Sequence, residues 1–414
     1  MSRPVVVVGI GAEGPSGLSP RALAAIASAT WVAGGRRHLG LVGPIPAETF
    51  TIADNVAELV DRLRRRGPDE RCVVLASGDP LCYGIGHRLG EDLGHDQIVV
   101  EPALSSLQLA FARAGLAWHD AAIASVHGRP LEKVLIPLLG LPKIGLFTQD
   151  GSSPSTVASF FLDRGLDDYD VWVGERLGAP DERVVSARLS ALVGKSFADL
   201  NVLVLRRDPQ DDPESSVARG RRLGIDDSRF ARPDSGPVLL THADARAVVV
   251  ARFHGLLEGP IWDIGAGLGG VAVELARAFP ETEVVAIERS EEQLPFLRIN
   301  RARFGAYNMR IVAGEAPGCL IGERRPAGVF LGGSGGRLDP ILDLLGERLP
   351  PGGVLVANFV GLENLSRALE RFRAEGWATS LTQLQISHGR PLAGLTVLSP
   401  LYPVWVLQAT RPRV

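Results

Sequence analysis

Short runs of apolar, often β-branched residues recur along the first half of the chain and alternate with amphipathic stretches. The apolar runs are VVVVGI (5–10), VVLAS (73–77), IVVEP (98–102), IGLFT (144–148), VWVGE (171–175) and LNVLVL (200–205). Between them, stretches such as SPRALAAIASA (19–29) and NVAELVDRLRR (55–65) place apolar residues at helical spacing. The alternation predicts an α/β domain.

The second half shows the same alternation of apolar runs and amphipathic stretches, with clearer turns between them. Its apolar runs are IWDIG (261–265), EVVAIE (283–288), MRIVAG (309–314), AGVFLGG (327–333) and GVLVANFV (353–360), followed by a late pair around 379–387 and 404–409. Helical patterns separate most of them. This order predicts a Rossmann-like, doubly wound and mostly parallel sheet whose last strands are antiparallel.

Residues 206–236 interrupt both patterns. This stretch is rich in Asp, Arg, Pro and Ser and has little apolar periodicity, which is typical of a linker. We therefore predict a first domain over residues 1–208, a linker over 209–236 and a second domain over 237–414.

Composition limits the classes of function. The 44 Lys and Arg residues nearly balance the 47 Asp and Glu residues, so the net charge of −3 offers no basic footprint for nucleic acid. The three cysteines (Cys72, Cys82 and Cys319) are too few for a disulfide framework and lack metal-ligand spacing, so we expect no metal site. Without an apolar run of about 18 residues or a leader-like N-terminus, we expect a cytoplasmic protein with no membrane partner.

A glycine-rich loop, WDIGAGLGG at 262–270, follows the first strand of the second half. Gly265, Gly267 and Gly270 match the dinucleotide fingerprint G-x-G-x-x-G, which leaves an NAD-dependent oxidoreductase as an alternative. Asp263 favours another ligand, because a dinucleotide-binding strand normally has an apolar residue there. The pattern D-x-G-x-G-x-G resembles the first motif of S-adenosylmethionine-dependent methyltransferases, in which a carboxylate can meet the cationic amino group of the methionine moiety.

Other residues extend this resemblance. Glu288 ends the next strand, where a carboxylate can accept hydrogen bonds from ribose hydroxyls, and Gly314, Glu315 and Ala316 resemble the segment that flanks the adenine. The residues that we predict to bind the cofactor in this half are Thr241, Asp263, Gly265, Gly267, Gly269, Glu288, Gly314, Glu315, Ala316 and Gly332.

The segment FLGGSGGR offers a second alternative. Gly332, Ser334 and Gly336 match the nucleophile elbow of hydrolases, and His388 lies downstream where a triad histidine could stand. No HGGG-type oxyanion segment precedes this elbow, which weakens the hydrolase interpretation.

The first half resembles the tetrapyrrole methylase family over about residues 4–206. The matching segments are the loop after the first strand with Gly9 and Gly11, the Gly78-Asp79-Pro80 loop, the EPALSS segment with Ser105 and Ser106, and residues 125–130 and 173–184. In the first loop Ala12 replaces the family's proline, and the acidic residue of the family motif is lost. The resemblance implies a two-lobed α/β fold with S-adenosylmethionine held between the lobes, by Gly9, Gly11, Gly78, Asp79, Pro80, Ser105, Ser106 and Leu177.

The pairing of these two halves resembles the fused, decarboxylating precorrin methyltransferases of cobalamin biosynthesis. Segments 239–246, 330–336 and 387–394 add to the likeness. The resemblance implies one S-adenosylmethionine site per domain, a polycarboxylate tetrapyrrole substrate and self-association, with methylation of carbon 5 in the first domain and methylation of carbon 15 with decarboxylation in the second. Among candidates for catalysis in these segments are Ser334 and three arginines that could clamp substrate carboxylates, Arg246, Arg337 and Arg390.

Overall fold

The computed structural model describes residues 2–148, 150, 153–207, 223–234, 240–253 and 258–413. Its contacts divide the chain into two compact units. The first comprises Met1–Val134, Leu141–Ser159 and Asp167–Asp208, and the second comprises Pro209–Val414 with the short segments Leu135–Gly140 and Phe160–Leu166. Much of the predicted linker, residues 209–222, 235 and 236, lies outside the described residues.

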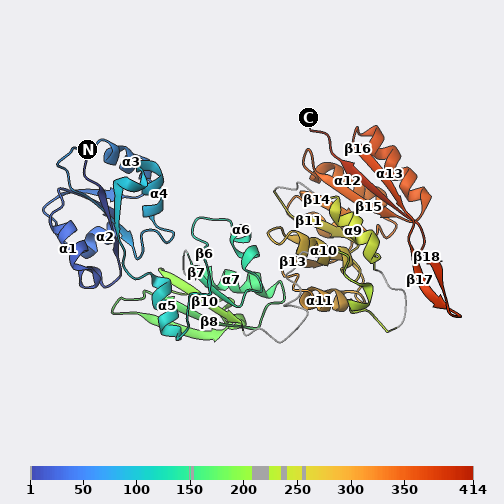
Figure 1. Ribbon diagram of the computed structural model, residues 1–414, viewed down its shortest axis with the longest axis horizontal. Helices are drawn as coiled ribbons and strands as arrows, with labels where there is room; N and C mark the ends of the chain where they lie inside the picture. Colours follow the sequence, from blue (N-terminus) through green and yellow to red (C-terminus); the bar gives the residue numbers. More distant parts are fainter. Residues whose placement is uncertain are drawn as a thin grey trace. The chain divides into compact units, whose positions relative to one another are not determined.

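The first unit contains two sheets (Figure 1). The first sheet has the strand order β3-β2-β4-β1-β5, and all of its pairings are parallel. Its elements are β1 (Val5–Ile10), α1 (Pro20–Ala27), β2 (Trp31–Gly35), α2 (Arg36–Val42), β3 (Glu48–Ile52), α3 (Val56–Arg64), β4 (Cys72–Ser77), α4 (Ile85–Leu93) and β5 (Ile98–Glu101). Separate apolar clusters cover its two faces, so its central strands are apolar on both sides.

The second sheet of this unit has the order β6-β7-β10-β8-β9, in which only the β6–β7 pairing is parallel. Its elements are α5 (Ser106–Ala114), β6 (Ala122–Ser125), α6 (Leu131–Leu135), β7 (Lys143–Phe147), α7 (Ser153–Leu162), β8 (Tyr169–Glu175), β9 (Arg183–Arg188) and β10 (Asn201–Arg207). The two sheets form the two lobes predicted for this half of the chain.

The second unit is built on a seven-stranded sheet of order β13-β12-β11-β14-β15-β19-β16. Its elements are α9 (Ala243–Ala251), β11 (Ile261–Ile264), α10 (Gly270–Ala278), β12 (Val284–Glu288), α11 (Leu294–Arg303), β13 (Met309–Ala313), β14 (Gly328–Leu331), α12 (Leu338–Arg348), β15 (Val354–Phe359), α13 (Leu362–Ala374), β16 (Ala378–Leu384) and β19 (Val404–Thr410). The pairings of β19 with β15 and β16 are antiparallel and the others parallel, so the predicted doubly wound sheet with late antiparallel strands is confirmed.

A hairpin of β17 (Ser387–Leu392) and β18 (Leu395–Pro400) projects from this sheet (Figure 1). The sequence pattern did not predict it as a separate element. None of its residues is buried, so no alternation of buried and exposed positions marks its strands.

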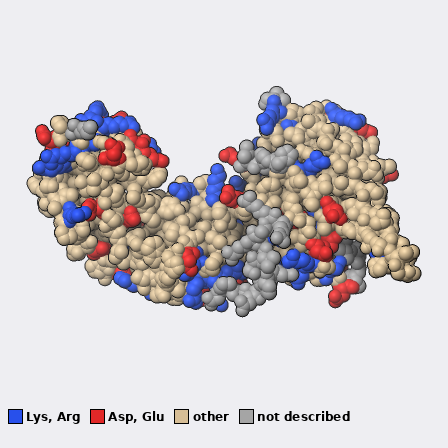
Figure 2. Space-filling model, viewed as in Figure 1, with Lys and Arg blue, Asp and Glu red and all other residues tan. Residues whose placement is uncertain are grey.

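In Figure 2 basic and acidic side chains are interspersed over the face shown. Among the described residues, no helix is both long and apolar enough to cross a membrane.

A network of buried charges joins α9 to α10 in the second unit. The Arg246 guanidinium is fully buried; its Nε donates to Glu274 Oε1 at 2.8 Å and its Nη1 donates to Asp227 Oδ1 at 2.6 Å. It also donates to the carbonyl oxygens of Thr241 and Ile225. These contacts tie Ile225, Asp227 and Thr241, which precede α9, to Glu274 on α10, so they give Arg246 a structural role. That Arg246 is also a catalytic group stays a prediction, which its complete burial does not favour.

Removing this guanidinium should destabilise the protein. Arg246→Met leaves Glu274 buried without its counter-ion, which typically costs about 3–5 kcal/mol. We expect a clearly lower unfolding temperature for the full chain in calorimetry. The matched control is Arg371→Met, because Arg371 pairs with Asp343 and Glu375 at a partly exposed site, where a loss of about 0–1 kcal/mol is expected. Equal destabilisation by the two variants would contradict the structural role of Arg246.

Candidate functional sites

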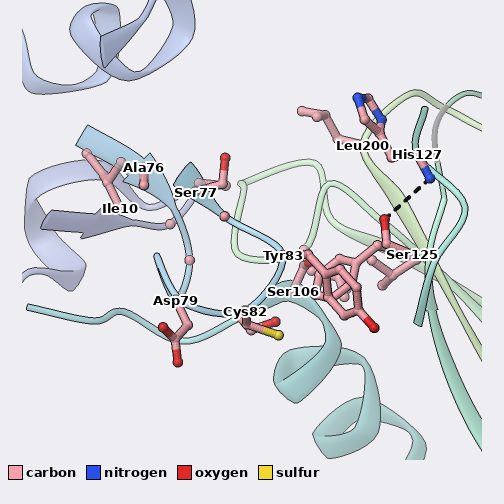
Figure 3. Close-up of a pocket in the computed structure, with 18 of the residues that line it drawn as sticks. Ile10, Ala76, Ser77, Asp79, Cys82, Tyr83, Ser106, Ser125, His127 and Leu200 are labelled. Atoms are coloured by element: carbon pink, nitrogen blue, oxygen red, sulfur yellow. Dashed lines mark hydrogen bonds between the residues drawn. The ribbon is translucent and has the colours of Figure 1, made fainter. Parts of the chain in front are cut away.

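In each unit a cavity lies at the carboxyl ends of the parallel strands. The cavity of the first unit has a volume of about 500 Å³ and is lined by both lobes. Figure 3 shows Ser77, Asp79 and Cys82 on one side and Ser125, His127 and Leu200 on the other. Of the predicted residues, Gly11, Gly78, Asp79, Ser105, Ser106 and Leu177 line it.

Gly9 and Pro80 do not line this cavity. Gly9 instead packs against the backbone segments that form its wall. A Cβ on Gly9 would lie 1.9 Å from the carbonyl oxygen of Gly78 and 2.6 Å from the amide nitrogen of Ala103. Only glycine allows the three strand ends to meet this closely. The Ala103 N–H donates to Gly78 O at 3.2 Å, which ties the loop after β4 to the segment after β5.

Ser105 begins helix α5 at the cavity wall. Its Oγ accepts from the N–H of Leu107 at 3.2 Å, while Gln108 Oε1 accepts from the Ser105 N–H at 2.8 Å. This capping box positions the start of the helix, whose dipole favours negative charge, toward the cavity.

The structure adds residues that the sequence motifs did not indicate. Glu13 stands in the loop said to have lost its acidic residue; its carboxylate fills the space beside Gly11, Gly17 and Gly178, and its Oε2 is buried with no hydrogen-bond partner among the described residues. No family motif placed an acid at this position, so only the fold of the loop could reveal it.

Arg37 and His38 also line the cavity of the first unit. His38 Nε2 lies 2.8 Å from Ser77 Oγ, and burial, with a smaller effect of the Arg37 charge, lowers the pKa of His38 to about 4. The imidazole is therefore neutral near pH 7 and presents a polar but uncharged group.

The cavity of the second unit has a volume of about 880 Å³. Nine of the ten cofactor residues predicted for this half line it, together with Ser334: Thr241, Asp263, Gly265, Gly267, Glu288, Gly314, Glu315, Ala316 and Gly332. The tenth, Gly269, lies behind the wall as the N-cap of α10 with a φ of +87°.

The glycine-rich loop is shaped by a close backbone contact. Gly265 has a φ of +76°, and a Cβ there would lie 2.7 Å from the carbonyl oxygen of Gly333. The loop amides then turn toward Glu288, whose Oε2 accepts from the Gly267 N–H at 2.7 Å and whose Oε1 accepts from the Ser290 N–H at 2.7 Å. Two backbone donors thus hold the Glu288 carboxylate at the cavity wall, with lone pairs left for a ligand.

Asp263 places a buried carboxyl group in the wall of this cavity. It is 1% exposed, and neither carboxylate oxygen has a hydrogen-bond partner among the described residues. Burial raises its pKa to about 7, the Glu288 charge adds to this, and the nearby Ala272 amide opposes it without reaching hydrogen-bond geometry. A buried carboxylate without a partner is costly unless a donor or cation arrives. This site therefore suits a ligand that carries a positive group.

The remaining predicted residues lie outside the cavity wall. Arg337 is half-exposed and pairs with Glu315 Oε2 at 3.0 Å, while Arg289 pairs with Glu315 Oε1 at 2.6 Å. These cations lower the pKa of Glu315, Arg289 most strongly. Arg390 lies on the exposed strand β17 and is not among the residues that line the cavity.

The hydrolase alternative does not fit this geometry. Strand β14 ends at Leu331 and α12 begins at Leu338, so Ser334 does not stand on a sharp strand-to-helix turn. The described ion pair of His388 is with Asp244 at 3.5 Å, and its ring packs on His242. Neither contact involves Ser334.

Two family models match separate parts of the chain. Residues 4–193 match the family model of tetrapyrrole (corrin/porphyrin) methylases, and residues 235–411 match that of the precorrin methyltransferase domain. A precorrin-6Y C(5,15)-methyltransferase [decarboxylating] of Sinorhizobium sp is 32% identical over 97% of this chain and 94% of its own length.

Two shorter relatives from Salmonella typhimurium each cover about half of the chain. A cobalt-precorrin-6B C(15)-methyltransferase (decarboxylating) is 37% identical over 44% of this chain and 93% of its own length. A cobalt-precorrin-7 C(5)-methyltransferase is 35% identical over 49% of this chain and 98% of its own length. By its near full-length match to the first relative, the chain belongs to the family of decarboxylating precorrin-6Y C(5,15)-methyltransferases.

Proposed function

We propose that this chain methylates precorrin-6Y at carbons 5 and 15 and removes carbon dioxide from the acetate on carbon 12, giving precorrin-8. The observation that carries this proposal is the presence of two separate cavities, one per unit, each at the carboxyl ends of parallel strands and each lined by glycines and polar groups. One chain can then use S-adenosylmethionine twice.

In the second unit the residues present fit S-adenosylmethionine. Asp263 offers its unpartnered carboxylate to the ammonium group of the methionine moiety, and Glu288 offers its carboxylate to the ribose hydroxyls. Gly314, Glu315 and Ala316 form the wall for the adenine. A pyrophosphate would meet the Asp263 and Glu288 charges at the same place, so the NAD alternative is not supported.

In the first unit the donor is held mainly by backbone and small groups. Gly11, Gly78 and the capped start of α5 at Ser105 provide a narrow wall that admits a ligand close to the main chain. Gly78 has a φ of +55°, and a Cβ there would lie 3.1 Å from the Cα of Ser105, so glycine lets the loop after β4 approach the start of α5 closely.

We assign the methylation of carbon 5 to the first unit, and that of carbon 15 with the decarboxylation to the second. The two half-length relatives carry these activities as separate proteins according to their names.

The chemistry asks the protein for orientation more than for a nucleophile. S-adenosylmethionine supplies an electrophilic methyl group on a sulfonium. Each cavity has to align the carbon that receives the methyl group and to exclude water when substrate is bound. The conjugated macrocycle can accept the electron pair left by carbon dioxide. Arg337 and Arg390 stay our candidates for binding peripheral carboxylates, and Ser334 stays a candidate at the cavity wall.

Self-association stays a prediction, and one surface supports it. The hairpin β17–β18 leaves Leu395 and Leu398 70% and 73% exposed. A second copy of the chain could cover this apolar surface.

The reaction can be tested directly. Incubation of the purified chain with precorrin-6Y and methyl-labelled S-adenosylmethionine should add two methyl groups and remove one carbon dioxide, as measured by mass spectrometry of the macrocycle. Transfer of hydride with NADH in place of methylation would overturn the proposal.

Asp263 should matter for one donor site only. We expect Asp263→Ala, and the isosteric Asp263→Asn, to weaken S-adenosylhomocysteine binding at the second unit roughly 10- to 100-fold, because a charge-assisted hydrogen bond contributes about 1.5–3 kcal/mol. Calorimetry of the full chain should still detect the site of the first unit. Equal loss at both sites would contradict the assignment.

The same carboxylate predicts a pH dependence. Its pKa of about 7 in the free protein means that it is largely protonated below neutral pH. An ammonium ligand needs the ionised form, so affinity at the second unit should fall about tenfold per pH unit below pH 7 and level off above it. In Asp263→Asn this dependence on the Asp263 proton should vanish. A wild-type affinity that does not change between pH 6 and 8 would argue against a contact between Asp263 and the ammonium.

A further inference from the structure

Two histidines and an aspartate meet at the mouth of the second cavity. His242 directly precedes α9, Asp244 lies in its first turn, and His388 comes from the distant strand β17. The two imidazole rings are 4.7 Å apart, and the ring nitrogens and carboxylate oxygen that could bind an ion all lie within 4.8 Å of one another. His242 also lines the cavity.

The two distances from the Asp244 carboxylate match the spacing of donors in a tetrahedral metal site. Asp244 Oδ2 lies 3.3 Å from His242 Nδ1 and 3.5 Å from His388 Nε2. Zinc binds imidazole nitrogen and carboxylate oxygen at about 2.0–2.2 Å, and at tetrahedral angles these bonds place neighbouring donors about 3.3–3.5 Å apart. An ion could therefore bind with little change in the two distances from Asp244 Oδ2 to the histidine nitrogens.

The surroundings orient His242 for such a role. Its Nε2 lies 3.4 Å from Asp227 Oδ2, and Asp227 is itself held by Arg246 Nη1 at 2.6 Å. Histidines that bind metals usually donate their other ring N–H to a carboxylate in this way. The Nδ1 atom of His242 is left facing Asp244, buried and without a hydrogen-bond partner among the described residues.

We propose that His242, Asp244 and His388 bind a divalent transition-metal ion, Zn²⁺ in particular. Two imidazoles with one carboxylate suit zinc and its neighbours in the first row better than Mg²⁺ or Ca²⁺, which prefer oxygen ligands alone. Three protein ligands leave a fourth position for water. If the proposed function holds, a carboxylate of the macrocycle can take that position; the metal site itself does not depend on that function.

The simplest competing explanation is an ordinary surface ion pair. Asp244 and His388 are 57% and 50% exposed in their side chains, and a protonated histidine would pair with Asp244 without any ion. This explanation predicts no specific metal binding. The sequence analysis expected no metal because it considered cysteine spacing, and His242 and His388 are far apart in the chain.

Metal binding can be measured without substrate. We expect the full chain, stripped with a chelator, to bind one Co²⁺ with the strong visible absorption of a tetrahedral site, and one Zn²⁺ in competition with it. His388→Gln should abolish the visible bands. Asp227→Asn should weaken binding about 10- to 100-fold, as is typical when a group that orders a ligand is lost.

The matched control is His87→Gln. His87 is another exposed histidine beside a carboxylate, 3.7 Å from Glu91 on α4, and its loss should leave the Co²⁺ spectrum unchanged. Circular dichroism checks that each variant is folded. Absence of tetrahedral Co²⁺ bands in the wild type, or an unchanged spectrum in His388→Gln, would overturn the proposal. S-adenosylhomocysteine affinity, measured on the same variants, reports on the proposed function separately.

Discussion

Both cavities depend on backbone segments that approach one another more closely than any side chain would allow. At the end of β1, Gly9 packs directly on the carbonyl of Gly78, and in the second unit Gly265 packs on the carbonyl of Gly333. In each unit the loops that follow neighbouring parallel strands are pressed together at the carboxyl edge of the sheet. This contact leaves backbone groups and small side chains as the wall of the cavity.

Charge is distributed differently around the two cavities. The second unit buries Arg246 and Glu274 as an ion pair, and Arg246 also pairs with the partly exposed Asp227, which stabilises the segment that leads into α9. In the same unit Asp263 is buried without a hydrogen-bond partner among the described residues, and its raised pKa reflects that burial. The charge of Arg246 is neutralised within the fold, whereas the carboxylate of Asp263 is left for a ligand to pair with. The first cavity relies instead on helix α5, on the neutral His38 and on the carboxylate of Glu13 beside its glycines.

The sequence analysis succeeded where a residue acts through its local backbone. The central strands could be predicted because they are buried on both faces and read as continuous apolar runs, and the glycine loops because their turns require glycine at definite spacing. It failed where a role depends on partners from elsewhere in the chain. Arg246 was a candidate for binding a substrate carboxylate, but its segment alone did not show that Glu274 and Asp227 pair with it in the fold. The exposed hairpin β17–β18 has no buried face, so its sequence has no hydrophobic pattern from which it could be predicted.

The sequence alone was enough to predict the two α/β domains, the parallel sheets and the glycine loops with Asp263 and Glu288. Hydrophobic periodicity and turn chemistry are local properties, so the sequence shows them directly. The tertiary structure decided which charged groups are free. It paired Arg246 inside the second unit, left the carboxylate of Asp263 unpartnered in the cavity wall, and brought His388 beside His242 and Asp244. The physical reason is that a charge acts through its neighbours and its exposure to water, and both are set by residues that are distant in the chain.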